Sequence, residues 1–271
     1  MSEADAIASS ERPATRSSIA DELRALGVEA GMTVMVHSSL SRLGFVVGGA
    51  QAVVQALLDV VGPAGTLMMP THSGALCDPV NWKNPPVPES WWQTIRDEMP
   101  AFDPAVTPSR GMGAVVECFR CLPGVQRSYH PTVSAAAIGP NAAALVHTHD
   151  LEDRLGDTSP QGKLYDLDGH ILLLGVDHGN NTSLHVAEVR SGQMSVVADA
   201  APILVDGQRQ WVELTHVDDD DGDFSALGEA FATTGAECQG PIGTGVGRLV
   251  RSRDIVDFGV EWMQANRVRP S

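Results

Sequence analysis

The segment Ile171–Glu188 constrains the fold more than any other stretch of this chain. An apolar strand runs into a polar turn, and the turn opens a helix that carries His185 and Glu188. Residues three apart on a helix lie on one face, so the imidazole and the carboxylate are within reach of each other. We expect Thr182 or Ser183 to cap the helix start. The pair then lies just beyond the carboxyl end of a buried strand, where open α/β sheets bind ligands.

From the residues alone, this pair admits three interpretations. A neutral histidine oriented by a carboxylate can take a proton from a nucleophile near pH 7. A buried histidine can equally be paired with a neighbour on its helix only to satisfy its hydrogen bonds. His178, His185 and Glu188 could also supply nitrogen and oxygen ligands to a metal. Against the metal, His178 precedes the helix and no obvious further ligand accompanies the three.

The charge of the chain excludes one class of partner. Its 34 acidic and 18 basic side chains give a formal net charge of -16. Because phosphate contacts need clustered Lys and Arg, nucleic acid is not expected as a partner. An acidic cleft can concentrate a cationic ligand, although an acidic surface can also serve only solubility. No apolar run is long enough to span a membrane, so we expect no membrane partner.

Cysteine usage points to a reducing compartment. Four cysteines in 271 residues do not make a disulfide framework. Cys118 and Cys121 form a C-x-x-C, but they fall inside a helical pattern and no second pair accompanies them. We therefore expect a cytoplasmic protein. Residues 1–16 are largely small and polar and lack the basic start and apolar stretch of a signal peptide, which predicts a disordered lead-in.

The rest of the chain alternates helices and strands in the manner of a layered α/β protein. Residues 17–271 are predicted to form a single domain, interrupted at about 72–110 by an irregular insertion. Six prolines between Pro79 and Pro104 and three of the five tryptophans favour a lid over a disordered segment. The predicted elements are a helix from about Ser18, with Asp21 in a capping box, to Gly27; strands at 33–37, 66–69, 133–138 and from Ile171; helices at 48–61, from Gly111 to Pro123, after Pro140 and from Ser252 or Asp254; and a hairpin at 203–214 turning at Asp206-Gly207.

A polar loop follows the first predicted strand. It reads His37-Ser-Ser-Leu-Ser-Arg-Leu-Gly44, and Gly48-Gly49 opens the next helix. Hydroxyls, a guanidinium and free backbone N–H groups at a helix start form an anion site. The spacing matches neither a P-loop nor a G-x-G-x-x-G fingerprint, and a generic loop remains the alternative.

Several motifs in order give the chain a family resemblance. With these segments the chain resembles the aminoglycoside 3-N-acetyltransferases, the antibiotic N-acetyltransferases that are distinct from the GNAT fold. The similarity covers about residues 17–265. The matching segments are 36–41, 62–70, 102–108, 110–113, 127–131, 137–140, the Leu-Leu-Gly-Val … Leu-His-Val-Ala-Glu block, 240–243 and 254–260.

The resemblance implies a fold and a reaction. It implies a three-layer α/β/α sandwich around a central mixed sheet, with an inserted irregular subdomain. It also implies acetyl-CoA as co-substrate, no metal, and acetylation of the 3-amino group on the 2-deoxystreptamine ring of aminoglycosides, which confers resistance. The expected partners are coenzyme A and the aminoglycoside, and the expected state is a monomer or a homodimer.

The resemblance also implies roles for individual residues. His185 is the expected base, and Glu188 orients it and belongs to the sugar-binding wall. Asp218 and Asp219 match the stretch that contacts substrate amines. The expected cofactor-binding residues are Ser38, Ser39, Leu40, Ser41, Arg42, Gly48 and Gly49 for the pyrophosphate and pantetheine, Thr107, Arg110, Met112 and Gly113 in the cofactor slot, and His130 beside it.

The chemistry fits a base, because an aminoglycoside amine is largely protonated at pH 7 and only the free amine attacks a thioester. Both substrates can bind together, so no acyl-enzyme is required. Two other hypotheses stay open: an acyl-CoA-dependent N-acyltransferase of the same fold that acts on a different amine, and a non-catalytic binding protein. Turnover of acetyl-CoA with a panel of aminoglycosides separates the three.

Overall fold

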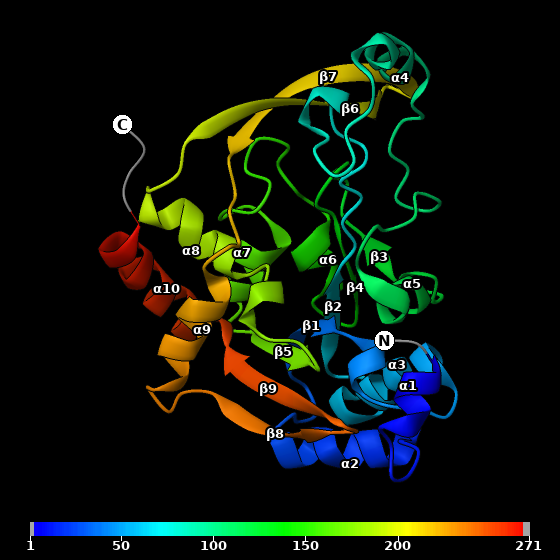
Figure 1. The fold of residues 1–271 in the computed structure, drawn as a ribbon, viewed down its shortest axis with the longest axis vertical. Coiled ribbons are helices and arrows are strands. Elements are labelled where there is room, and N and C mark those ends of the chain that lie inside the picture. Colours follow the sequence, from blue (N-terminus) through cyan, green and yellow to red (C-terminus); the bar gives the residue numbers. More distant parts are fainter. Residues whose placement is uncertain (1–2, 268–271) are drawn as a thin grey trace.

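A seven-stranded mixed sheet forms the centre of the molecule (Figure 1). The computed structural model describes residues 3–267. β1 is parallel to β2 and β5, and the other neighbouring strands are antiparallel. In sheet order the strands are β3 (Gln126–Arg127), β4 (Ala135–Ile138), β2 (Thr66–Pro70), β1 (Thr33–Ser38), β5 (His170–Leu174), β9 (Gly245–Arg251) and β8 (Cys238–Ile242).

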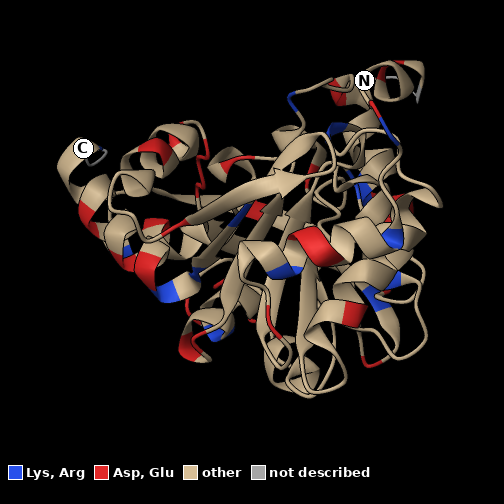
Figure 2. Cartoon of the chain, turned by 90° about the horizontal axis from the view of Figure 1, so that it is seen from below, with Lys and Arg blue, Asp and Glu red and all other residues tan. Residues whose placement is uncertain are grey.

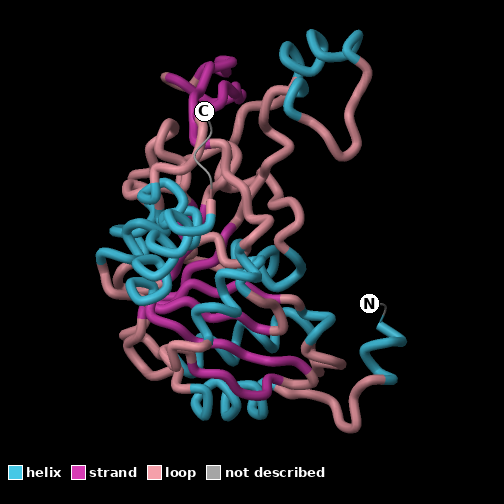
Figure 3. Tube along the Cα trace, turned by 60° about the vertical axis from the view of Figure 1, so that its left-hand side comes forward, coloured by secondary structure: helices cyan, strands magenta, loops and turns pink. Residues whose placement is uncertain are grey.

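Helices cover both faces of this sheet (Figures 1 and 3), which confirms the predicted three-layer arrangement. Strand side chains point alternately to the two faces, so Val34 and Val36 belong to one apolar core and Met35 to the other. The first core is closed by α2 (Arg16–Leu26), α3 (Gly49–Val61) and α5 (Gly113–Arg120). The second is closed by α6 (Ala142–Val146), α7 (Pro160–Asp166), α8 (Leu184–Ser191), α9 (Phe224–Ala232) and α10 (Ser252–Asn266).

A two-stranded hairpin projects from this body, at the top of Figure 1. It consists of β6 (Val196–Val205) and β7 (Gln208–Val217). Asp206 and Gly207 at its tip both have positive φ, as a tight hairpin turn requires. The predicted hairpin and its turn are confirmed.

The insertion packs on this hairpin. It contains α4 (Trp92–Glu98) and two 3-10 turns, η2 (Pro79–Asn81) and η3 (Glu89–Trp91). The N–H of Phe102 donates to the Pro202 carbonyl at 2.9 Å, and the N–H of Asp78 donates to the Asp199 carboxylate at 3.1 Å. That the insertion acts as a lid stays a prediction.

The expected disordered lead-in is wrong for residues 3–16. Helix α1 (Glu3–Ala8) is followed by a backbone bridge from Ala14 to Val46. The Ser10 hydroxyl accepts from the N–H of Phe45 at 2.9 Å. These partners are more than thirty residues away, so the polar composition of the segment gave no sign of them. Residues 1 and 2 lie outside the described residues.

Two predicted helix caps are also corrected. α2 begins at Arg16, because Thr15 and Ser18 form the capping box. Neither Thr182 nor Ser183 caps α8 through its side chain. The Asn181 side-chain oxygen instead accepts from the N–H of Ser183 at 3.1 Å.

β8 and β9 were not expected, because glycine is depleted in strands and five of the residues from 235 to 247 are glycine. The two strands pair with each other, and β9 covers the edge of β5.

Within residues 3–267, no helix is long and apolar enough to cross a membrane.

Arg127 ties the insertion to the sheet. Its guanidinium donates to the carbonyls of Thr71 at 2.7 Å and Thr107 at 2.5 Å. It also lies 5.0 Å from the centre of the Phe102 ring. Burial lowers the pKa of Arg127 to about 10, so it remains charged at neutral pH.

Replacing this guanidinium should weaken the fold, since Arg127→Met removes the charged donor that the carbonyls of Thr71 and Thr107 share. We expect the free energy of unfolding to fall by about 2–4 kcal/mol, measured by chemical denaturation. Arg16→Met is the control, because it removes an exposed pair with Asp59 and should change little. Equal midpoints for the two variants would contradict the anchoring role.

Candidate active site

The site begins where β1 and β5 end side by side. Because the strands are parallel, Ser38 lies opposite Leu174 in the register. The Ser39 N–H donates to the Leu174 carbonyl at 2.9 Å, so the turn after β1 runs beside the turn after β5. The first turn contains the 3-10 helix η1 (Leu40–Arg42) and the second contains η4 (His178–Asn180). Two loops far apart in sequence thus meet at one edge of the sheet.

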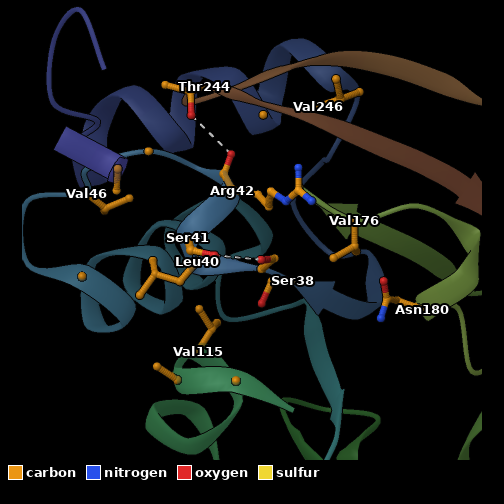
Figure 4. A pocket seen from close by; sticks show the side chains of 18 of the residues that line it. Ser38, Leu40, Ser41, Arg42, Val46, Val115, Val176, Asn180, Thr244 and Val246 are labelled. Atoms are coloured by element: carbon orange, nitrogen blue, oxygen red, sulfur yellow. Dashed lines mark hydrogen bonds between the residues drawn. The ribbon is translucent and has the colours of Figure 1, made fainter. Parts of the chain in front are cut away.

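A large cavity of about 1230 Å³ opens between these turns, α5 and β9 (Figure 4). The Thr244 hydroxyl donates to the Arg42 carbonyl at 3.3 Å, which links the turn between β8 and β9 to the turn after β1. Eight of the predicted cofactor-binding residues line this large cavity. They are Ser38, Ser39, Leu40, Ser41, Arg42, Gly49, Met112 and Gly113.

The other predicted cofactor-binding residues line neither this cavity nor the one beside it. Gly48 is the residue before α3. The Thr107 hydroxyl accepts from the N–H of Asp103 at 3.0 Å. Arg110 is exposed.

His130 is enclosed rather than beside the cavity. It is 1% exposed, and its Nδ1 accepts from the N–H of Val133 at 3.2 Å. Its ring packs on His149 with 4.6 Å between centroids. Burial lowers the pKa of His130 well below its usual value, so the ring is neutral.

A small cavity of about 260 Å³ adjoins the large one. The two share Ser38, Gly111, Met112, Val176 and Asn180 as common walls. His185 lines the small cavity. A ligand that fills the large cavity therefore borders the small cavity that His185 lines.

His185 and Glu188 form the predicted pair. The distance from Nδ1 to the Oε2 atom of Glu188 is 2.6 Å, and the side chains of the two residues are 10% and 1% exposed. With a neutral ring, Nδ1–H donates to the carboxylate, which leaves Nε2 as the basic nitrogen. Within residues 3–267, no group hydrogen-bonds to Nε2. The Phe224 ring packs on the imidazole at 4.9 Å.

The second oxygen of Glu188 has partners that sequence reasoning missed. Oε1 accepts from the N–H of Asp220 at 3.0 Å and from the Arg267 guanidinium at 2.5 Å. Both partners come from distant parts of the chain, the turn after β7 and the residue after α10. No local pattern around Glu188 could reveal them.

The acidic turn, residues 218–223, places its aspartates differently from the expectation. Asp219 lines the small cavity, but its carboxylate is paired with Arg154. Burial raises the pKa of Asp219, but the charge and hydrogen bond of Arg154, with smaller contributions from other neighbours, bring it below its usual value. Asp218 lines neither cavity, whereas Asp221 lines the small one. Within residues 3–267, the Asp221 carboxylate has no ion-pair partner.

Two further histidines line the small cavity. Burial, reinforced by neighbouring histidines, lowers the pKa of His37 to about 3 and that of His72 to about 3. Both rings are neutral at pH 7. Among the histidines that line this cavity in the described part of the chain, His185 alone is paired with a carboxylate.

His178 does not join His185 in a metal site. Its Nε2 lies 2.5 Å from the Glu237 carboxylate, which precedes β8. Residues 3–267 contain no group of three or more His, Cys, Asp or Glu side chains arranged to hold a metal. Glu237 also lies 3.7 Å from Arg248, and Arg248 lines the large cavity.

Two basic side chains line the large cavity within the described part of the chain: Arg42 and Arg248. Sequence reasoning found Arg42 and missed Arg248, because β9 was not expected. Elsewhere acidic side chains are more numerous, and Figure 2 shows them spread over the surface helices and loops. Asp177 is the carboxylate that lines the same cavity, so the two arginines leave its lining with a positive balance on an acidic protein, which suits an anionic ligand.

Comparison with known proteins assigns the fold to a family. A sequence model described as aminoglycoside 3-N-acetyltransferase matches residues 35–264. The chain belongs to the aminoglycoside 3-N-acetyltransferase family. The match includes the turn after β1, His185 and Glu188, and it ends before Arg267.

Two relatives in this family cover nearly the whole chain. The SPbeta prophage-derived aminoglycoside N(3')-acetyltransferase-like protein YokD of Bacillus subtilis (strain 168) is 45% identical, over 94% of each chain. Aminoglycoside N(3)-acetyltransferase VII of Streptomyces paromomycinus is 38% identical, over 97% of this chain and 96% of the relative.

Solved structures of family members agree with the fold. The crystal structure of YokD superposes with a TM-score of 0.95, at 43% identity, and covers 97% of this chain and 98% of YokD. AAC-IIIb in a binary complex with CoASH gives a TM-score of 0.85 at 30% identity, over 96% and 100% of the two chains. AAC-VIa bound to sisomicin gives 0.84 at 33% identity, over 94% and 99%.

The cavity depends on a close backbone approach at Gly245. A Cβ atom there would lie 2.6 Å from the Arg42 carbonyl oxygen and 3.4 Å from the Gly175 Cα atom. We expect Gly245→Ala to cost about 1–3 kcal/mol of stability by forcing β9 from the turn after β1. The control is Gly74→Ala, whose Cβ would meet nothing within 4 Å. Denaturation midpoints measure both, and an unaffected Gly245→Ala protein would refute the close packing.

Proposed function

We propose that this protein transfers the acetyl group of acetyl-CoA to the 3-amino group of the 2-deoxystreptamine ring of aminoglycosides and thereby confers resistance. The observation that carries the proposal is the position of His185, whose Nδ1 is bonded to Glu188 while its ring lines the small cavity beside the large one. The names of the relatives and the neighbours bound to CoASH and sisomicin support both substrates.

The large cavity is assigned to coenzyme A. Arg42 and Arg248 supply positive charge for its phosphates, and Ser39 and Ser41 supply hydroxyls. Ser38, Leu40, Gly49, Met112 and Gly113 line the same space and leave room for the pantetheine arm. The proposed cofactor roles of Gly48, Thr107, Arg110 and His130 lack this support, because these residues line neither cavity.

In the proposed reaction, the substrate ammonium first loses a proton to solvent. The nitrogen of the free amine then forms a bond to the thioester carbonyl carbon while Nε2 of His185 takes a second proton from it. The carbon–sulfur bond breaks, and the imidazolium gives this proton to the departing thiolate. Glu188 fixes the tautomer and stabilises the imidazolium. Both substrates are bound together, so the acetyl group passes directly to the amine. Because acetyl-CoA is an intracellular metabolite, we place the enzyme in the cytoplasm.

The experiment that tests this proposal measures release of free CoASH from acetyl-CoA in the presence of sisomicin, gentamicin and simple primary amines. Release that depends on the aminoglycosides, with the acetyl group on the 3-amino nitrogen, supports the proposal. Turnover confined to another amine favours the same-fold N-acyltransferase. No release with any amine would favour a non-catalytic binding protein.

Removing the proposed base should stop the chemistry without emptying the cofactor site. We expect His185→Gln to lower kcat by at least ~10²-fold, the scale of a lost general base, while the Kd for acetyl-CoA stays unchanged. The matched control is His147→Gln, which replaces an exposed histidine that lines neither cavity. Near-normal turnover in His185→Gln would exclude His185 as the base.

Cationic substrates need carboxylates, and Asp221 is the better candidate because Asp219 is already paired with Arg154. We expect Asp221→Asn to raise the KM for aminoglycosides and to leave that for acetyl-CoA unchanged. The effect should shrink at high salt, since charge attraction is screened over about 8 Å at physiological ionic strength. Asp218→Asn, which lies outside both cavities, is the control. Identical KM values for the two variants would remove Asp221 from the binding surface.

A further inference from the structure

Arg267, the residue after α10, reaches the back of the catalytic pair. Its Nη1 donates to Oε1 of Glu188 at 2.5 Å and its Nε donates to the Asp223 carboxylate at 2.7 Å. Its Nη2 donates to the Asp220 carbonyl at 2.8 Å. The guanidinium also lies 5.8 Å from the centre of the Phe224 ring, which packs on His185. One side chain thus joins Glu188, the acidic turn and the ring beneath the imidazole.

Because Glu188 is charged and buried, its contact with Arg267 has an electrostatic role as well as a structural one. Its side chain is 1% exposed, and a buried carboxylate needs a compensating positive charge. Within the described residues, two side chains that carry or can carry a positive charge are bonded to Glu188: Arg267 and His185. If the guanidinium supplies the charge, the imidazole can stay neutral. If the guanidinium is absent, the imidazolium is the form that the carboxylate favours.

We propose that Arg267 is a positioning residue for the reaction: it neutralises Glu188 from behind, so that Glu188 holds His185 by a hydrogen bond and leaves it unprotonated and ready to act as a base. The proposal rests on the proposed role of His185 and deepens it. Arg267 lies beyond the segment 35–264 that matches the family, so the family match alone does not assign it.

Arg267 itself keeps its charge in this surrounding. Burial lowers its pKa, but the hydrogen bonds to Asp223 and Glu188 raise it above the usual value. The other ionisable groups around the pair are carboxylates, two neutral histidines and one arginine. They are Asp219 and Asp221 of the acidic turn, Asp223 before α9, His37 at the end of β1, His72 after β2, and Arg154 paired with Asp219.

The test compares the pH dependence of kcat/KM in Arg267→Met with that of the unmodified enzyme. Removing the guanidinium favours the imidazolium of His185, so the acidic limb should move upward by about one pH unit. Activity lost at pH 6 should return substantially at pH 8.5. Arg267→Lys, which keeps the charge, should restore the limb toward its original position. Arg253→Met, at the start of α10 and bonded to the Tyr165 carbonyl, should leave the limb unchanged.

A double-mutant cycle isolates the route through Glu188. In the Glu188→Gln background there is no carboxylate to neutralise, so Arg267→Met should produce no additional shift. A further shift of equal size in that background would show that Arg267 acts on His185 without Glu188 and would overturn the proposal.

A direct titration covers the case in which Arg267→Met is too slow to assay. The imidazole ¹⁵N resonances of His185, identified by their loss in His185→Gln, should titrate at higher pH in Arg267→Met than in the unmodified protein. Equal titration midpoints would overturn the proposal, even if the variant has a lower thermal midpoint. The proposed base fails separately, through normal turnover of His185→Gln.

Discussion

The hydrogen bond between His185 and Glu188 is the contact on which the rest of the site depends. At 2.6 Å between two buried side chains, it fixes which nitrogen carries the proton and how the ring is turned. This bond requires that other groups hold the buried carboxylate in place and compensate its charge. The N–H of Asp220 and the guanidinium of Arg267, which also donates to the Asp220 carbonyl, provide that support. The acidic turn and the end of α10 are therefore parts of the site, although neither is near it in sequence.

The sheet explains why both cavities form at this place. Parallel β1 and β5 end at the same edge, so the two loops that follow them must lie together. β9 then closes one side, with Gly245 allowing its backbone to approach the Arg42 carbonyl. The result is a large cavity with two arginines that joins a small one with carboxylates. In the proposed assignment, an anionic cofactor occupies the cavity with the arginines and a polycationic substrate the cavity with the carboxylates, which His185 lines.

The sequence predicted those parts of the fold and the site that local patterns encode. The alternation of strands and helices, the hairpin turn at Asp206-Gly207 and the pairing of His185 with Glu188 are all features of short segments, and the structure contains them. What the sequence could not reveal depends on contacts between distant segments. Glycine-rich β8 and β9 form only because β5 offers an edge, which is why Arg248 was missed. A run of aspartates gives no sign of which one is paired, so the sequence could not single out Asp221, which lines the small cavity without an ion-pair partner among the described residues.

Direct transfer within a ternary complex is the central claim, and initial-rate kinetics with both substrates varied tests it most directly. If acetyl-CoA and the aminoglycoside occupy the adjoining cavities together, double-reciprocal plots at several fixed concentrations of the second substrate will intersect. Parallel lines, the pattern of a covalent acetyl-enzyme that forms before the aminoglycoside binds, would contradict the account.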